Sequence, residues 1–353
     1  MKSIVDIDKR MAVATSVERE GLCFLDAEDQ PFHVYGVFKE GEKFRRIPEE
    51  VAKRVSEGVY ELHANAAGGR VRFVTDSPYI AIKAKIRPMK MSCFALSGTC
   101  GFDMYWECDN EIRFGGTFMP PFEVEDWYES VLDHVNGRQE RIVTINFPLY
   151  SEVHQLYIGV REGSVLETAP DYLKGKPVVS YGSSITNGGC ASRPGNTYQS
   201  ILSRKLHMDH INLGFAGSGK AEDAIVDYIK ELDMSVFIMD YDHNAPDVEY
   251  LAATHNKMFQ KIRAAQPDLP IIIMPRPRYY LSADDQKRHE VIYATYQQAK
   301  AGGDENVYFI SGRELMAMVG DGGTVDNCHP TDGGFLSMAT AIAPVLEEIL
   351  AKL

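Results

Sequence analysis

The amino-acid sequence predicts an α/β protein in which an antiparallel β-sandwich, jelly-roll-like, precedes a doubly wound parallel sheet. Up to about residue 165, apolar and polar residues alternate over short runs such as RIVTINF at 141–147. This alternation is typical of antiparallel strands with one face in water. From about residue 175, near-continuous apolar runs such as PIIIMP at 270–275 alternate with helical stripes. That second pattern is typical of central parallel strands covered on both faces.

The first half contains three clear strand patterns, at 80–86, 141–147 and 156–160. In the first of them, the isoleucines at every second position face one way and Lys83 and Lys85 the other. The FGG run at 114–116 predicts a turn. A helix is expected near 48–57, where Val51 and Val55 recur four residues apart. We assign residues 1–168 to this β-sandwich domain.

The second half alternates strands with helices. Its predicted strands are 177–182, 210–215, 235–242, 270–275 and 306–311; its predicted helices are 196–207, 221–232, 248–265, 284–300 and 332–351. Asn196 is expected to cap the first of these helices. Breaks at Pro170, Gly175 and Pro177 place the boundary at 167–177 and the second domain at 175–353.

The charge of the chain limits its partners. The sequence has 50 acidic and 37 basic side chains, a formal net charge of −13. Such a chain repels phosphate backbones, so we expect no nucleic-acid partner, and anionic membrane surfaces are disfavoured for the same reason. With no apolar stretch of about 18 residues recognised, no membrane span is expected. The sequence leaves the oligomeric state open.

The six cysteines have neither CxxC pairs nor zinc-type spacing. Charged residues interrupt the apolar runs at the start of the sequence, so we expect no signal peptide. Together these features predict a cytoplasmic protein with free thiols. No metal and no cofactor are expected.

Polar or glycine-rich segments follow the strands of the second half. Ser184 follows the first strand, Gly217 the second and Asn244 the third, while Asp326 and His329 lie just before the last helix. Since the carboxyl ends of parallel strands meet at one edge of the sheet, these residues should converge there.

These segments resemble, in order, the blocks of SGNH (GDSL-like) hydrolases. Gly182-Ser183-Ser184-Ile185-Thr186 is similar to the first block, and Asp326-Asn327-Cys328-His329-Pro330 to the last, D-x-x-H-P. The resemblance covers about residues 177–351. Ser183 stands where the family more often has Asp, and the run that contains Asn244 departs from the G-x-N-D form of the third block.

The chemistry of these residue types supports the same roles. A serine hydroxyl needs a neighbouring base, which His329 supplies, and Asp326 three residues earlier can orient the imidazole. The resemblance implies oxyanion donors from the Ser184 and Gly217 backbone N–H groups and the Asn244 amide. Ser183 is a rival nucleophile, but Ser184 fits the G-x-S-x-T frame.

A second resemblance lies in the first half. Gly101-Phe102-Asp103-Met104-Tyr105 is similar to the G-x-D-L-Y signature of a β-domain that precedes some SGNH domains. The domain order is also similar to that of certain carbohydrate acetylesterases, in which the β-domain contributes to the rim of the active site.

Four further residues are candidate substrate contacts: Arg193, His243, Arg276 and Trp106. Each also has a structural interpretation. A loop arginine is more often paired with a carboxylate, a histidine at a strand end is more often buried support, and a tryptophan in a β-sandwich is more often core.

The sequence thus predicts a serine esterase that hydrolyses a short-chain acyl ester, most simply an acetyl group on a sugar or oligosaccharide, through a Ser184 acyl-enzyme. The alternatives are an acyltransferase or longer-chain, lipase-like esterase, a carbohydrate-binding protein with an inactive hydrolase domain, and, less well supported, a protease.

Overall fold

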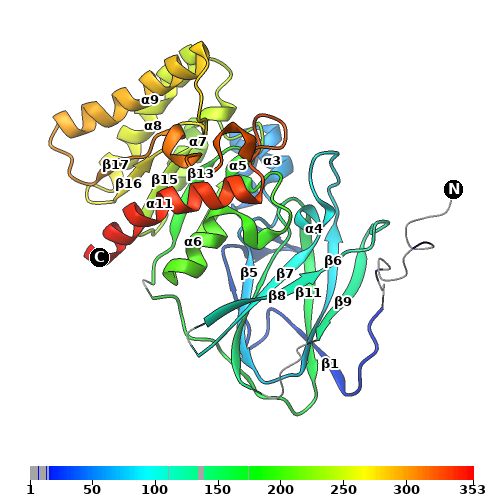
Figure 1. Ribbon diagram of the computed structural model, residues 1–353. Coiled ribbons are helices and arrows are strands. Elements are labelled where there is room, and N and C mark those ends of the chain that lie inside the picture. The colour runs from blue at the N-terminus through cyan, green and yellow to red at the C-terminus, as the bar shows by residue number, and fades with distance from the viewer. Residues whose placement is uncertain (1–6, 8–12, 14–15, 110, 134–138, 174) are drawn as a thin grey trace.

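The computed structural model describes residues 7, 13, 16–109, 111–133, 139–173 and 175–353. Within these, two antiparallel sheets form the first half and one parallel sheet the second, so the predicted fold class is confirmed. Figure 1 shows the parallel sheet and its helices packed beside the two antiparallel sheets.

The two antiparallel sheets enclose a common apolar core. One sheet has the order β1 (Leu22–Asp26), β11 (Glu152–Arg161), β6 (Tyr79–Arg87) and β9 (Trp127–Asp133). The other has the order β12 (Leu166–Glu167), β5 (Arg70–Thr75), β10 (Arg141–Asn146), β7 (Phe102–Cys108) and β8 (Glu111–Phe118), with β2 (His33–Tyr35) also on β5. This half also contains a hairpin of β3 (Phe38–Glu40) and β4 (Lys43–Arg45) and the short helix α4 (Leu96–Thr99).

The FGG run is not a turn, contrary to the sequence prediction. Residues 114–116 lie inside β8, and the pairing of β7 with β8 shifts register between Met104 and Tyr105. Gly116 has a φ of +134°, a conformation that L side chains rarely adopt. The glycines here lie at a β-bulge within the strand. A Gly-Gly pair is common both in bulges and in hairpin turns, so the residue types alone do not tell the two apart.

The parallel sheet has the order β14 (His210–Gly214), β13 (Val178–Gly182), β15 (Val236–Asp240), β16 (Ile271–Ile273) and β17 (Val307–Phe309). Alternate residues of each strand face opposite sides, so Val179 and Phe237 pack into one core cluster and Val178 and Val236 into another. Helices cover both clusters: α7 (Asp223–Ile229), α8 (Val248–Ala265) and α9 (Ala283–Ala301) on the first, and α6 (Tyr198–Leu206), α10 (Gly312–Leu315) and α11 (Asp332–Lys352) on the second.

The helix expected near 48–57 is two short helices, α2 (Glu49–Val55) and α3 (Glu57–Leu62). Ser56 between them is extended, and its hydroxyl accepts the Val59 N–H, which starts the second helix. Although both belong to the first half of the chain, Val51 and Val59 pack into the core of the parallel sheet. They share this core with Ile225 and Ile229 of α7, and α2 packs against α7. Figure 1 shows α3 behind α5 (Ser184–Asn187) in this view.

Two other expectations need correction. The helix predicted from 196 begins as a 3₁₀ turn (Pro194–Asn196), so Thr197, whose side chain accepts the Ser200 N–H, caps α6 in place of Asn196. The last helix, α11, is long and apolar enough by length and composition to cross a membrane, which the sequence analysis overlooked. However, 56% of that stretch is buried inside the protein, the pattern of a core helix.

Candidate active site

The loop between β13 and α5 places Ser184 at the carboxyl edge of the parallel sheet. Ser183 caps α5: its hydroxyl accepts the Ile185 N–H at 3.1 Å, while Thr186 Oγ1 accepts the Ser183 N–H at 3.1 Å. Ser184 is therefore the first residue of the helix, and its N–H has no intrahelical acceptor. Ser183 is almost wholly buried and its hydroxyl is engaged in the cap, whereas the hydrogen bond to His329 is made by Ser184.

Ser184, His329 and Asp326 lie in line. Ser184 Oγ lies 2.8 Å from His329 Nε2, and His329 Nδ1 lies 2.7 Å from Asp326 Oδ2. Burial alone would raise the pKa of Asp326, but hydrogen bonds from the His329 backbone N–H and imidazole lower it below its ordinary value. Asp326 is therefore a carboxylate at neutral pH and can hold the tautomer in which Nε2 accepts the serine proton.

The turn after β14 carries the second predicted block. Ser218 and Gly219 both donate their N–H groups to Phe215 O at 3.0 Å, and Gly217 at the tip has a φ of +66°. A Cβ at Gly217 would meet no atom within 4 Å, so its glycine is required by backbone conformation and not by crowding. Among the backbone hydrogen bonds of the described residues, none uses the Gly217 N–H.

Asn244 reaches the same turn but does not match its predicted role. Its Nδ2 donates to Phe215 O at 2.8 Å and to Gly219 O at 3.0 Å, so both amide hydrogens are engaged. Asn244 therefore braces the turn that carries Gly217.

The first half of the chain contributes two aromatic residues that the sequence analysis missed. The Phe94 ring packs edge-on against the His329 ring, and the two ring centroids are 5.5 Å apart. The centroid of the Tyr150 ring lies 5.0 Å from that of Phe94. Tyr150 donates its hydroxyl hydrogen to Ser184 O at 3.2 Å. Both lie in irregular segments, where no periodic pattern signals a role.

Two of the four candidate substrate contacts are ion-paired. Arg193 donates to Asp103 Oδ2 at 2.7 Å and to the Tyr105 hydroxyl, so it joins the two halves. Arg276 pairs with Asp242 at 3.3 Å and with Asp285 at 3.0 Å. Both guanidiniums are thus committed to structural carboxylates, and the expectation that they contact substrate is not supported.

The other two candidates are also placed elsewhere. His243 is half-buried, with Nδ1 3.7 Å from Cys328 Sγ. Burial chiefly, aided by Arg276 and Arg278, lowers its pKa well below the ordinary value, so it is neutral and supports the loop before His329.

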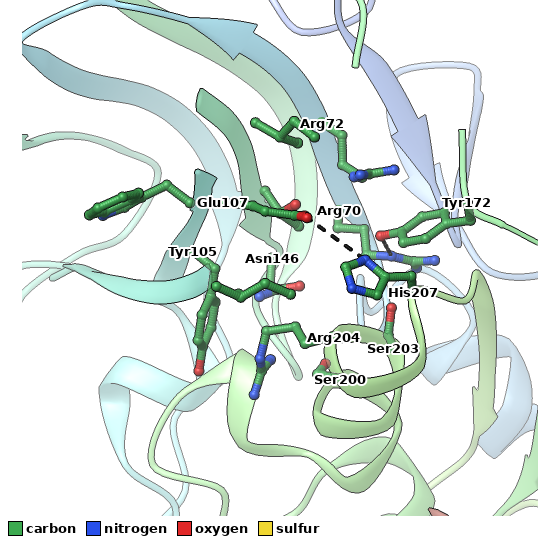
Figure 2. A pocket seen from close by; sticks show the side chains of 14 residues that line it. Arg70, Arg72, Tyr105, Glu107, Asn146, Tyr172, Ser200, Ser203, Arg204 and His207 are labelled. Atoms are coloured by element: carbon green, nitrogen blue, oxygen red, sulfur yellow. Dashed lines mark hydrogen bonds and ion pairs between the residues drawn. The ribbon is translucent and has the colours of Figure 1, made fainter. Parts of the chain in front are cut away.

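Trp106 lines a pocket formed mainly by residues of β5, β10, β7 and α6, and Ser184 is not among its lining residues. Figure 2 shows this pocket. Glu107 and His207 lie 3.9 Å apart across it. Its free volume of about 30 Å³ suits one or two waters, not a sugar ring.

A parallel sheet with an aligned serine, histidine and aspartate at its carboxyl edge is the arrangement of an α/β serine hydrolase. Residues 175–347 match the GDSL-like lipase/acylhydrolase family, and residues 22–166 match the N-terminus of SGNH-hydrolase-type esterases. The chain is therefore an ester hydrolase that carries a GDSL-like lipase/acylhydrolase domain behind an N-terminal domain of that type.

Solved structures show the same two-part architecture. A protein from Bacteroides ovatus assigned as a GDSL-like lipase is 28% identical over 94% of this chain and 98% of its own, with a TM-score of 0.84. A salicylyl-acyltransferase from a tetracycline biosynthetic pathway is 19% identical over 94% and 98%, with a TM-score of 0.75. An acetyl xylan esterase from the rumen bacterium Butyrivibrio proteoclasticus is 12% identical over 94% and 99%, with a TM-score of 0.59. No protein of curated function matches the sequence.

Proposed function

We propose that the protein hydrolyses short-chain acyl esters, most simply acetyl esters of a sugar or oligosaccharide, with Ser184 as nucleophile. The observation that carries this proposal is the 2.8 Å contact between Ser184 Oγ and His329 Nε2, backed by Asp326 on the far side of the imidazole. The sugar and the acetyl group are suggested by the acetyl xylan esterase, which shares this fold.

The reaction follows from these positions. Ser184 Oγ attacks the ester carbonyl while His329 Nε2 takes its proton, and the carbonyl oxygen gains a negative charge, for which we propose the Ser184 and Gly217 N–H groups as hydrogen-bond donors. His329 then protonates the departing alcohol, leaving an acyl-serine. A water activated by His329 releases the acid and restores the enzyme.

The first experiment compares wild type, Ser184→Ala and Ser183→Ala on p-nitrophenyl acetate, butyrate and octanoate. We expect Ser184→Ala to lose nearly all turnover, on the order of 10⁶-fold in kcat. Ser183→Ala, which loses only the cap of α5, should be about 1 kcal/mol less stable yet active. Turnover that survives in Ser184→Ala and disappears in Ser183→Ala would contradict the assignment. Acetylated xylo-oligosaccharides then test the sugar.

A second candidate is acyl transfer to an alcohol other than water. It is favoured by the salicylyl-acyltransferase, which shares the fold across both halves of the chain. Adding a series of alcohols to the acetate assay separates the two functions: a transferase makes new ester faster than free acid, while a hydrolase makes acid.

We also propose a reducing, cytoplasmic location, because all six cysteines are free thiols. Fractionation of the source cells, with a thiol count on the isolated protein, tests it.

A further inference from the structure

The segment that holds Asp326 and His329 is a tight, internally bonded turn. Val325 N–H donates to His329 O at 2.8 Å and closes it. Asp326 Oδ1 accepts the N–H groups of Cys328 at 3.1 Å and His329 at 2.8 Å, while Oδ2 meets the imidazole. One carboxylate therefore shapes the turn and orients the base.

This turn depends on an unfavourable backbone conformation at Asn327. Its φ is +62°, in the left-handed region that residues with a Cβ seldom occupy, although Asn tolerates it better than most. Reversal of the chain at this one residue is what brings the Asp326 carboxylate over the next two N–H groups. A contact that holds Asn327 would hold the triad geometry with it.

Arg278 makes that contact. Its Nη1 donates to Asn327 Oδ1 at 2.6 Å. The backbone that carries Arg278 follows β16 at the same sheet edge and is fixed nearby: Tyr279 N–H donates to Asp321 Oδ1 at 2.9 Å, and a Cβ at Gly312 would lie 3.0 Å from Arg278 N. The backbone contacts on both sides of Arg278 therefore fix the position from which its guanidinium reaches Asn327.

The charges at this edge set Arg278 apart from its neighbours. Arg276 pairs with Asp242 and Asp285, and Arg288 pairs with Asp242 and Asp284. Over the part of the chain that the structure describes, Arg278 has no carboxylate within ion-pair distance, and its Nε is buried. Its one side-chain hydrogen bond among these residues goes to the neutral amide of Asn327.

We propose that Arg278 is a positioning residue for catalysis, which acts through Asn327 to keep the Asp326–His329 pair aligned with Ser184. The proposal rests on the proposed function of Ser184. It predicts that loss of Arg278 affects the chemical step and not the binding of a neutral ester, and that this effect requires the Asn327 side chain.

The test is a double-mutant cycle of Arg278→Ala and Asn327→Gly, measured on p-nitrophenyl acetate, with Arg313→Ala as control. Arg313 is an exposed arginine on the same side that stacks on Tyr279 and does not bond Asn327. We expect Arg278→Ala to lower kcat about tenfold with KM nearly unchanged, since small displacements of catalytic groups cost this much or more. Arg278→Lys should recover part of the loss, and Arg313→Ala should behave as wild type.

In the Asn327→Gly background, Arg278→Ala should have little further effect. Additive losses, or a rise in KM with kcat intact, would overturn the proposal in favour of a structural or a substrate-binding arginine. Labelling by a fluorophosphonate, a serine-directed probe, separates this result from failure of the function itself. Ser184→Ala must be unlabelled, whereas Arg278→Ala must be labelled at Ser184 more slowly than wild type. Labelling of Ser184→Ala would remove the basis of both proposals.

Discussion

At the scale of single residues, Gly189 shows how closely the first half of the chain approaches the base. A Cβ built there would lie 2.8 Å from Phe94 Cε1, 2.9 Å from His329 Cδ2 and 3.0 Å from Ser184 O. Phe94, His329 and Ser184 thus all surround the space that a side chain at position 189 would fill. Glycine is needed here because of close approach and not because of a left-handed backbone.

We predict that Gly189→Ala displaces the His329 ring and lowers kcat on p-nitrophenyl acetate about 10- to 100-fold. Gly322→Ala is the matched control, since a Cβ at Gly322 meets no atom within 4 Å. Circular dichroism and thermal melts show whether the variants fold. Equal activity of the two variants would mean that the loop at residue 189 shifts to make room for the added methyl group without displacing His329.

Residue identity also explains which parts of the site the sequence could predict. The sequence could predict that Ser184, Asp326 and His329 come together, as the structure places them, because they stand in recognisable motifs at strand ends. The roles of Phe94, Tyr150 and Arg278 could not be predicted, since they depend on contacts between segments more than 30 residues apart. Asn244 was expected to donate to substrate because a residue type does not reveal which acceptors its amide already has.

At the scale of elements, the start of α5 rests on a buried acid in the neighbouring strand. Thr186 Oγ1, which accepts the Ser183 N–H, donates to Asp240 Oδ2 at 2.9 Å. Burial raises the pKa of Asp240 from 3.8 to about 7, against the lowering effect of hydrogen bonds from Thr186 and Tyr198. The strand β15 therefore holds a carboxyl group that is largely protonated below neutral pH.

This shift has a definite sign. Between about pH 4 and pH 7 the unfolded chain releases the Asp240 proton while the native state keeps it, so the contribution of Asp240 to the free energy of unfolding falls as pH rises. Asp240→Asn, neutral throughout, should remove this trend. Over that range we expect the free energy of unfolding of wild type to fall relative to the variant by on the order of a few kcal/mol.

Urea titrations at several pH values measure this difference. Asp268→Asn, at an exposed acid, serves as the control and should run parallel to wild type. A difference between wild type and Asp240→Asn that stays constant from pH 4 to 8 would show that Asp240 titrates normally in the native protein.

Elements with strong periodicity were the ones that the sequence predicted well. The runs at 177–182, 235–242 and 270–275 contain β13, β15 and β16, and the helix expected at 248–265 has those bounds. Errors arose where local hydrogen bonds override periodicity, as where Ser56 divides the helix expected near 48–57 or where glycine makes a bulge in β8. Whether the local hydrogen bonds or the periodic pattern determines the structure depends on tertiary contacts, and a short stretch of sequence does not reveal these contacts.

At the scale of the whole molecule, Asp103 links the two halves. It is fully buried and accepts hydrogen bonds from Arg193 at 2.7 Å, from Gly195 N–H at 2.9 Å and from Asn146 at 2.8 Å. The middle position of the G-x-D-L-Y-like motif is thus an anchor for the loop that follows the nucleophile helix. A buried charge with all its partners present becomes costly when one member is removed.

We predict that Asp103→Ala lowers the free energy of unfolding by about 3–5 kcal/mol, because Arg193 loses its carboxylate. Asp133→Ala breaks the exposed pair with Arg19, whose N···O distance is 2.9 Å, and should cost no more than about 1 kcal/mol. Urea unfolding of both variants measures the difference. Comparable losses would indicate that the interface pair is as well solvated as the surface one.

The packing of α2 and α3 against the parallel sheet bears on how such a protein can be divided. Ile47, Val51 and Val59 belong to the same apolar cluster as Tyr181 and Met239. One face of the parallel sheet is therefore covered in part by residues more than 100 positions earlier in the chain. The chain passes from one half to the other near residue 170, and a cut there would separate the parallel sheet from α2 and α3, which cover part of it. If the first halves of two relatives were exchanged, the incoming half would have to supply a helix pair that packs against the same face of the parallel sheet. We therefore expect the two halves to be exchanged together and not separately.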